Sequence, residues 1–246
     1  MNKALFVASR TGKGPETWGP VARLERLSTG YRFLYTRGAE ILKGFRPFPG
    51  MSNINEIYES DELFPLFTCR LLNKSRPEYR DYLTWCGFDP NDPPDPTTLL
   101  GVTEGRRVTD PIELFPCHSQ DSNGWSVVKF FLHDINRFAV EKIDQLKEGD
   151  ELSVPFQCGE LHDKNVVAVG IVNAEKTFLG HTPRYLASDV YELCQKCSPD
   201  SIRLTVERVN RNAPLQQRLL CRLNTCWPED FHPCTGEEYQ PLVTTY

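Results

Sequence analysis

The chain has 246 residues, of which 39% are hydrophobic and 25% are charged, and its net charge is −5. This composition is typical of a folded protein with one large or two small domains, and it excludes a disordered chain. No apolar run approaches the ~20 residues that cross a bilayer, so we expect no membrane partner. Because Met1–Arg10 is too short and too soon charged for a signal peptide, we expect a cytoplasmic protein with nine reduced cysteines.

The first half of the chain predicts a β-meander with short helices. Runs rich in apolar and aromatic residues predict the strands 3–9, 21–27, 31–35 and 108–115. Apolar residues at helical spacing predict the helices 61–71, 75–86 and 97–102. Ser75 and Glu78 have the spacing of a capping box, and Gly87 is placed to end the second of these helices.

The second half predicts many short strands and two helices. Cys117–Gly124 is polar and rich in turn-forming residues, so we expect two domains, 1–118 and 119–246. Strands are predicted at 125–132, 152–156, 166–172, 177–181, 202–209 and 215–223. Helices are predicted at 139–146 and 184–196. The sequence therefore indicates an α+β protein in which the second domain is a small barrel.

Motifs of the common nucleotide-dependent and hydrolytic enzymes are absent. The chain has no G-x-x-x-x-G-K-[ST] loop, no G-x-G-x-x-G run, no G-x-S-x-G elbow and no set of kinase motifs. The acidic excess lies entirely in residues 119–246, so a bulk basic footprint for nucleic acid is also absent. We expect a protein that is not an enzyme and needs no cofactor.

One group of cysteines leaves a zinc site open. Cys194 and Cys197 have zinc-knuckle spacing. The second pair of ligands would come from Cys221, Cys226, His232 and Cys234. The alternative is that Cys194 belongs to an apolar helix face and that the other cysteines are small buried residues.

A second group suggests metal-dependent hydrolysis. Glu160, His162 and Asp163 lie in one expected loop and carry side chains that bind metal ions. They are the candidate centre of a metal-dependent nuclease or phosphatase that acts on DNA ends. The alternative is an ordinary polar loop.

A local basic segment lies inside the acidic half. Between Ile202 and Cys226 the charged residues are Arg203, Glu207, Arg208, Arg211, Arg218 and Arg222. We expect Arg203 and Arg222 to share the outer face of a hairpin, where they would contact phosphates. Solvated strand faces with no ligand have a similar composition.

Three segments of the second half resemble the HIRAN domain. They are Glu148–Asp150, the run Gly159–Val169 and the run Leu179–Ala187, which match the family's motifs in order and spacing. The resemblance covers roughly residues 125–200. It implies a modified OB-like barrel that binds single-stranded DNA and grips its free 3′ end.

The resemblance also implies candidate nucleic-acid-binding residues. The family's arginine followed by two aromatic residues falls near Asn136, Arg137 and Phe138, so Arg137 would meet a phosphate and Phe138 would stack on a base. Packing of Phe138 in the core is the alternative. His162 and Asp163 complete the set, although the family's N-P-Y run before the aspartate is Glu-Leu-His here.

The first half resembles the small N-terminal subdomain of HipA-type toxin kinases. The matching segments are 24–27, 31–35, 64–67, 70–72, 96–101 and 114–116. The kinase active site of that family lies in later domains, which this chain lacks. The resemblance therefore implies docking on a separately encoded HipA-like Ser/Thr kinase and no kinase activity.

Taken together, these features predict a regulatory accessory protein. Residues 119–246 would bind single-stranded DNA or DNA ends, and residues 1–118 would bind the kinase, as the antitoxin or targeting subunit of a toxin–antitoxin or phage-defence system. A metal-dependent nuclease or phosphatase is the alternative. A third reading is a protein-interaction module whose barrel has lost DNA binding, which the acidic charge favours.

Overall fold

In the computed structural model, three stretches of the chain are described: residues 4–107, 110–155 and 168–243. They form two compact units. The first unit combines residues 1–74, 94–117 and 232–246. The second unit combines residues 75–93 and 118–231. The chain crosses from the first unit to the second between Cys117 and His118, next to the domain boundary that the sequence predicts. The separate functions of the two domains stay a prediction.

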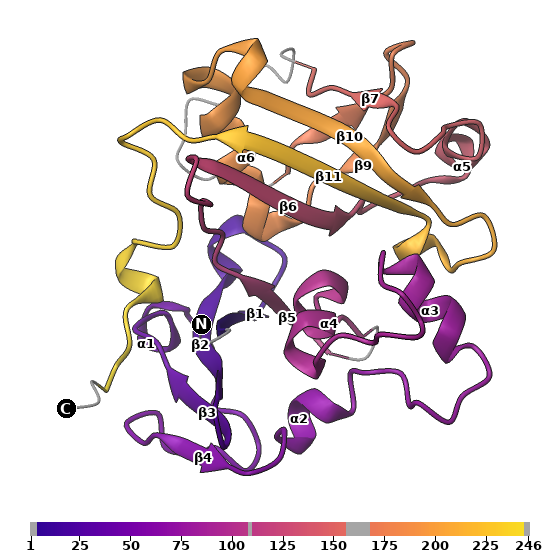
Figure 1. Ribbon diagram of the computed structural model, residues 1–246. Coiled ribbons are helices and arrows are strands. Elements are labelled where there is room, and N and C mark those ends of the chain that lie inside the picture. The colour runs from indigo at the N-terminus through magenta and orange to yellow at the C-terminus, as the bar shows by residue number, and fades with distance from the viewer. Residues whose placement is uncertain (1–3, 108–109, 156–167, 244–246) are drawn as a thin grey trace. The chain divides into compact units, whose positions relative to one another are not determined.

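The first unit is built on a five-stranded antiparallel sheet with the order β4-β3-β2-β1-β5 (Figure 1). Its strands are β1 (Ala4–Arg10), β2 (Trp18–Leu27), β3 (Gly30–Tyr35), β4 (Tyr58–Ser60) and β5 (Ile112–Pro116). The turn into β3 needs a glycine, because Gly30 has φ +148° and an added Cβ would lie 2.4 Å from the Ser60 carbonyl oxygen. The predicted meander is confirmed.

Short helices complete the first unit. They are α1 (Gly38–Ile41), α2 (Pro65–Thr68) and α4 (Pro96–Thr103), with single 3₁₀ turns at Pro15–Thr17 and Glu237–Tyr239. Asp95 begins α4 by accepting a hydrogen bond from the backbone N–H of Thr98 at 3.1 Å. Pro96 follows at the first helical position, where a missing N–H costs nothing.

Aromatic side chains fill the core of the first unit. Phe33, Tyr35 and Phe67 are fully buried, and Phe33 lies 5.0 Å from Tyr35 edge to face. The Tyr35 hydroxyl donates to the Met51 carbonyl at 2.7 Å and accepts from the Phe48 N–H at 2.8 Å. Burial raises the pKa of Tyr35 to about 12, so the hydroxyl stays protonated and holds the proline-rich loop onto the sheet.

The second unit contains a four-stranded antiparallel sheet, β6-β11-β10-β7, and a two-stranded sheet, β8-β9. The strands are β6 (Trp125–Phe131), β7 (Glu151–Leu152), β8 (Gly170–Val172), β9 (Phe178–His181), β10 (Ile202–Val209) and β11 (Leu219–Cys226). The helices are α3 (Tyr79–Trp85), α5 (Arg137–Ile143) and α6 (Arg184–Lys196), with 3₁₀ turns at Pro199–Ser201 and Leu215–Gln217. The predicted α+β class with antiparallel sheets is confirmed.

Within the described residues, these two sheets do not close into a barrel. Single bridges pair Ser153 with Val172 and His133 with His181, so the two-stranded sheet borders the larger sheet at both of its edges. β7 contributes only two residues to the larger sheet, because only Leu152 and Glu151 pair with β10. A closed barrel requires continuous strand pairing around the whole sheet, and the described residues do not form this pairing.

Helix α3 differs from the sequence prediction at its start. It begins at Tyr79, and Glu78 at the N-cap position makes no side-chain cap bond, so the predicted capping box is wrong. The helix does end before Gly87, which has φ +78° as expected. The Asn210 side chain donates to the Trp85 carbonyl at 3.0 Å and so ties α3 to the loop after β10.

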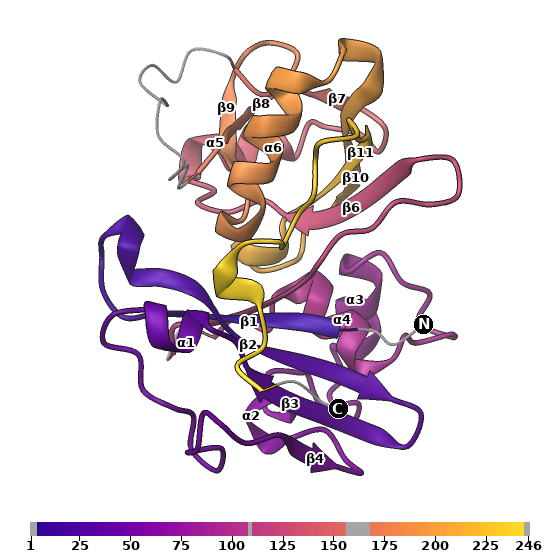
Figure 2. The ribbon, with the colours of Figure 1, turned by 90° about the vertical axis from the view of Figure 1, so that its left-hand side faces the viewer.

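Helix α6 covers the strands of the second unit with its apolar face (Figure 2). Its buried residues are Tyr185, Leu186, Ala187, Val190 and Leu193. Their spacing puts them on one face, as the sequence predicts. None of the helices in the described part of the chain is long and apolar enough to cross a membrane.

Candidate nucleic-acid interface

The first group of candidate residues lies at the start of α5. The Asn136 side-chain oxygen accepts hydrogen bonds from the backbone N–H groups of Phe138 at 2.9 Å and Ala139 at 3.0 Å. Asn136 is therefore the N-cap of the helix. This cap starts the helix at Arg137, two residues before the predicted start.

Arg137 and Phe138 both face solvent. The exposed fraction of Phe138 is 88%, the largest among the exposed large hydrophobic residues that the structure describes. The alternative that Phe138 packs in the core is therefore wrong. Arg137 is exposed and forms no ion pair with any described residue. An exposed cation and an exposed aromatic ring are thus neighbours in the chain at the start of the helix, where their side chains point about 100° apart around the helix axis.

Strand β9 packs against α5 and adds a second aromatic side chain. Phe178 is 38% exposed, and its ring lies 4.9 Å from the His181 ring in an edge-on arrangement. His181 Nδ1 lies 3.3 Å from the Asp134 carboxylate. Sequence reasoning missed Phe178, because a single aromatic residue in a four-residue strand gives no signal of which face it occupies.

The second group lies on β10 and β11. Thr205 pairs with Arg222, and Arg203 pairs with Asn224, so alternation puts Arg203 and Arg222 on the same face of the sheet. This geometry is the predicted one. The Arg203 side chain is 70% exposed, whereas the Arg222 Nε donates to the Asn224 side-chain oxygen at 3.1 Å.

Acidic side chains neutralise much of this basic segment. The ion pairs are Arg203 with Glu151 at 3.8 Å, Arg208 with Glu148 at 3.8 Å, Arg218 with Asp144 at 3.8 Å and Arg222 with Glu207 at 3.5 Å. Glu207 also binds Lys129 at 2.5 Å, and Lys129 pairs with Arg222 across the neighbouring strands. The positive charge that the sequence shows locally is therefore much smaller on the surface.

The same sheet carries exposed apolar residues that the sequence analysis did not single out. Trp125 is 38% exposed and Val127 is 50% exposed, and both lie on β6. Val127 pairs with Asn224, which in turn pairs with Arg203, so these three residues share one face. The burial pattern of β6 alternates, but its sequence does not: Val127 is as apolar as the buried Val128, and the buried Ser126 is polar, so the sequence gives no signal of which face is exposed.

Three predicted residues cannot be placed. His162 and Asp163, which belong to the candidate nucleic-acid site, lie outside the described residues, and so does Glu160. The proposed metal-dependent centre therefore stays a hypothesis. Among the residues that the structure does describe, no group of three or more His, Cys, Asp or Glu is arranged to hold a metal ion.

Cys194 and Cys197 are free thiols near the end of α6. Burial, with a smaller contribution from the neighbouring Cys197, raises the pKa of Cys194 to about 11. The Cys197 thiol donates to the carbonyl oxygen of Cys226 at 3.5 Å, while Cys221 is fully buried in β11. A second cysteine pair facing Cys194 and Cys197 is not formed among the described residues.

No family model, curated protein or solved structure matches the chain. The HIRAN and HipA resemblances consequently stay predictions that rest on the quoted motifs. The chemistry of the exposed side chains must carry any functional argument.

Proposed function

We propose that the second unit binds single-stranded DNA or DNA ends, without catalysis, through the surface formed by Arg137 and Phe138. The observation that carries this proposal is the 88% exposure of Phe138 beside an exposed arginine. Base stacking on an aromatic side chain contributes about 1–3 kcal/mol per base, and an arginine supplies a phosphate contact.

The N-cap supports this role because it fixes the backbone that carries both side chains. Phe138 and Ala139 donate to Asn136, so the ring projects from an ordered first helical turn. A preorganised ring loses less conformational entropy when a base stacks on it. Asn136 is a positioning residue in this proposal, and Phe178 on β9 offers a second ring for a neighbouring base.

Electrostatics make the proposed binding weak and only slightly dependent on salt. The chain is acidic overall, and the arginines of β10 and β11 are largely paired with carboxylates. Few phosphates would be neutralised, so affinity would depend on stacking more than on counterion release. Arg203, with its 70% exposed side chain, is the member of that group best placed to reach a phosphate.

We also propose that the second unit has a HIRAN-type, OB-like arrangement. The two single bridges, Ser153 with Val172 and His133 with His181, support it, because they continue the strand order across both gaps between the sheets. OB-like barrels commonly bind extended single strands.

Fluorescence anisotropy with a labelled single strand that has a free 3′ end tests the DNA proposal. At low salt, we expect binding that Phe138→Ala weakens about 5- to 100-fold, which corresponds to the loss of one stacking contact. Phe138→Trp should keep the binding. Leu215→Ala is the matched control, because Leu215 is a 49% exposed apolar residue of the same unit. Absence of binding at low salt, or equal loss in the control, would contradict the proposal.

The same samples test the catalytic alternative. Incubation of the bound strand with magnesium or manganese should leave it uncut if the unit only binds DNA. Cleavage that requires the metal ion would instead support the nuclease hypothesis for Glu160, His162 and Asp163.

We further propose that the first unit docks on a HipA-like Ser/Thr kinase, so that the chain acts as an antitoxin or targeting subunit. The five-stranded meander, with the short strand β4 at one edge of the sheet, is compatible with this role. Co-purification with a kinase encoded next to this chain tests it. Failure to co-purify, with DNA binding retained, would limit the function to the second unit.

A further inference from the structure

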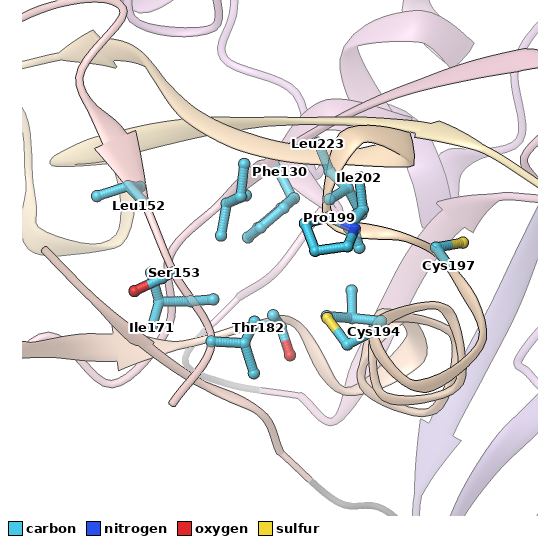
Figure 3. A pocket seen from close by; sticks show the side chains of 13 residues that line it. Phe130, Leu152, Ser153, Ile171, Thr182, Cys194, Cys197, Pro199, Ile202 and Leu223 are labelled. Carbon is cyan, nitrogen blue, oxygen red and sulfur yellow. The ribbon is translucent and has the colours of Figure 1, made fainter. Parts of the chain in front are cut away.

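The second unit contains an apolar cavity of about 220 Å³ that the DNA proposal does not use (Figure 3). Side chains from β6, β7, β8, β10, β11 and α6 line it. The apolar members are Phe130, Leu152, Val154, Ile171, Val190, Pro199, Ile202, Leu204 and Leu223. Its other members are Ser153, Thr182, Cys194 and Cys197, so the described lining holds no charged side chain.

One polar group in this lining has no partner. The exposed fraction of Thr182 is 2%, and its hydroxyl oxygen forms no hydrogen bond with any described residue. The backbone of Thr182 is satisfied, because its N–H donates to the Val169 carbonyl at 2.9 Å. A buried hydroxyl without a partner is destabilising, and native proteins rarely keep one unless a water or a ligand satisfies it.

The size and polarity of the cavity restrict what it can hold. Apolar cavities of about 150 Å³ stay dry and accept benzene, so about 220 Å³ accommodates one ring with a short substituent. A charged ligand is disfavoured, because the described lining offers no opposite charge. A water molecule needs two or more polar partners, and mostly aliphatic walls supply few.

We propose that this cavity binds a small neutral molecule that is mostly apolar and carries one hydroxyl or carbonyl group for Thr182. Thr182 and Cys194 lie on the side of the cavity opposite Phe130 and Leu223 (Figure 3). The ligand's apolar body therefore packs against the strands, and its polar group faces α6. Arg137 and Phe138 do not line the cavity, so this site is independent of the proposed DNA interface.

Toluene and benzyl alcohol form a matched pair of probes, because they differ by one hydroxyl group. With the full chain, both should raise the melting temperature in a concentration-dependent way. Benzyl alcohol should bind about three- to tenfold more tightly than toluene, once the difference in their transfer from water is subtracted, because it pairs with Thr182. Thr182→Val keeps the shape of the side chain and removes the hydroxyl. In that variant the preference for benzyl alcohol should disappear, while toluene binding stays within about twofold.

Cysteine labelling gives a second readout that does not depend on melting. Cys194 lines the cavity, whereas Cys69 is an exposed cysteine of the first unit. Saturating benzyl alcohol should slow maleimide modification of Cys194 and leave Cys69 unchanged. Val190→Phe, which fills part of the cavity, should abolish the protection.

Three results would overturn the proposal. The first is the absence of any melting shift with either probe. The second is an unchanged preference for benzyl alcohol in Thr182→Val. The third is equal protection of Cys194 and Cys69, which would indicate a nonspecific solvent effect. DNA binding enters none of these measurements, so failure here leaves the DNA proposal untouched.

Discussion

The Asn136 side chain determines where the Phe138 ring stands, because its oxygen accepts the Phe138 backbone N–H at 2.9 Å. The capped residue is the most exposed large hydrophobic side chain described, at 88%. The N-cap that starts the helix thus also fixes the backbone from which an aromatic ring projects into solvent. Exposure of this large apolar ring to water is unfavourable in free energy, and a base that stacks on the ring would remove it from water.

Loss of the cap should reduce both stability and DNA binding. Asn136→Ala removes the acceptor of two backbone N–H groups, which should lower the free energy of unfolding by about 1 kcal/mol. Asn136→Asp keeps an acceptor and should keep the wild-type stability, whereas its added negative charge should weaken DNA binding. Urea denaturation measures stability, and anisotropy measures binding. Unchanged stability in Asn136→Ala would show that the cap contributes nothing.

A buried arginine should be important for the first unit. The Arg70 side chain is 1% exposed and binds Asp110 at 2.8 Å, the Gly105 carbonyl at 3.0 Å and the Leu66 carbonyl at 3.0 Å. Arg70→Met leaves these acceptors without their donor, so we expect a loss of about 3 kcal/mol in the free energy of unfolding.

Two further variants serve as comparisons for the loss of stability in Arg70→Met. Arg70→Lys keeps the charge but not the planar fork, so its loss should be intermediate. Arg46→Met changes an exposed arginine of the same unit and should alter stability by less than about 0.5 kcal/mol. Denaturant unfolding that shows equal effects for Arg70→Met and Arg46→Met would contradict the assigned role.

Local sequence patterns predict elements whose signals are local. Helix α6 at Arg184–Lys196 and strand β10 at Ile202–Val209 have the predicted bounds, since helical spacing and alternation are visible in single segments. The spacing of Ser75 and Glu78 does not mark a helix start, because a capping-box spacing also occurs in turns, and α3 begins only at Tyr79. Apolar spacing alone predicts α5 at 139–146, whereas the Asn136 cap starts the helix at Arg137.

The candidate site depends on pairings that the sequence does not display. Arg203 and Arg222 share a face, as alternation predicts, but their partners Glu151 and Glu207 follow from the strand order and the register. The charge of the surface was therefore overestimated. The apolar cavity that buries Thr182 is lined by residues from six separate elements. No continuous stretch of sequence therefore predicts this burial.

Protonation of one histidine should contribute a loss of stability in acid to the second unit. Burial lowers the pKa of His118 to about 4, below its ordinary value of 6.5, so the unfolded chain binds this proton first. This histidine alone should therefore lower stability by roughly 2–3 kcal/mol between about pH 6.5 and pH 4, and the opposite contribution of Asp189 partly cancels this loss in the wild type. His118→Phe keeps an aromatic ring near Tyr185 and should remove the contribution of the histidine, so that the opposite contribution of Asp189 remains and stability falls as pH rises from about 4 to about 7.

An exposed histidine provides the control for that measurement. His232 is exposed, so His232→Phe should leave the pH dependence of unfolding as it is in the wild type. Denaturant unfolding at several pH values measures all three proteins. An acid-induced loss that persists in His118→Phe would assign it to other groups.

Asp189 should give the opposite slope over an overlapping range. Burial, with a further contribution from Glu192, raises the pKa of Asp189 from 3.8 to about 7. The folded state then holds this proton more tightly than the unfolded chain, so stability should fall as pH rises from about 4 to about 7. Asp189→Asn removes the penalty and should stabilise the protein by about 2–4 kcal/mol at pH 8, with little effect at pH 4.

Comparison of His118→Phe, Asp189→Asn and the double variant separates the contributions of these two groups to the pH dependence of stability. The Asp189 and His118 slopes partly cancel in the wild type between about pH 4 and pH 6.5, so each single variant should show a steeper pH dependence than the wild type. Asp200→Asn makes the same chemical change at an exposed position and should shift stability by less than about 0.5 kcal/mol. If Asp189→Asn stabilises the protein equally at pH 4 and pH 8, the effect does not come from ionisation of this carboxyl group.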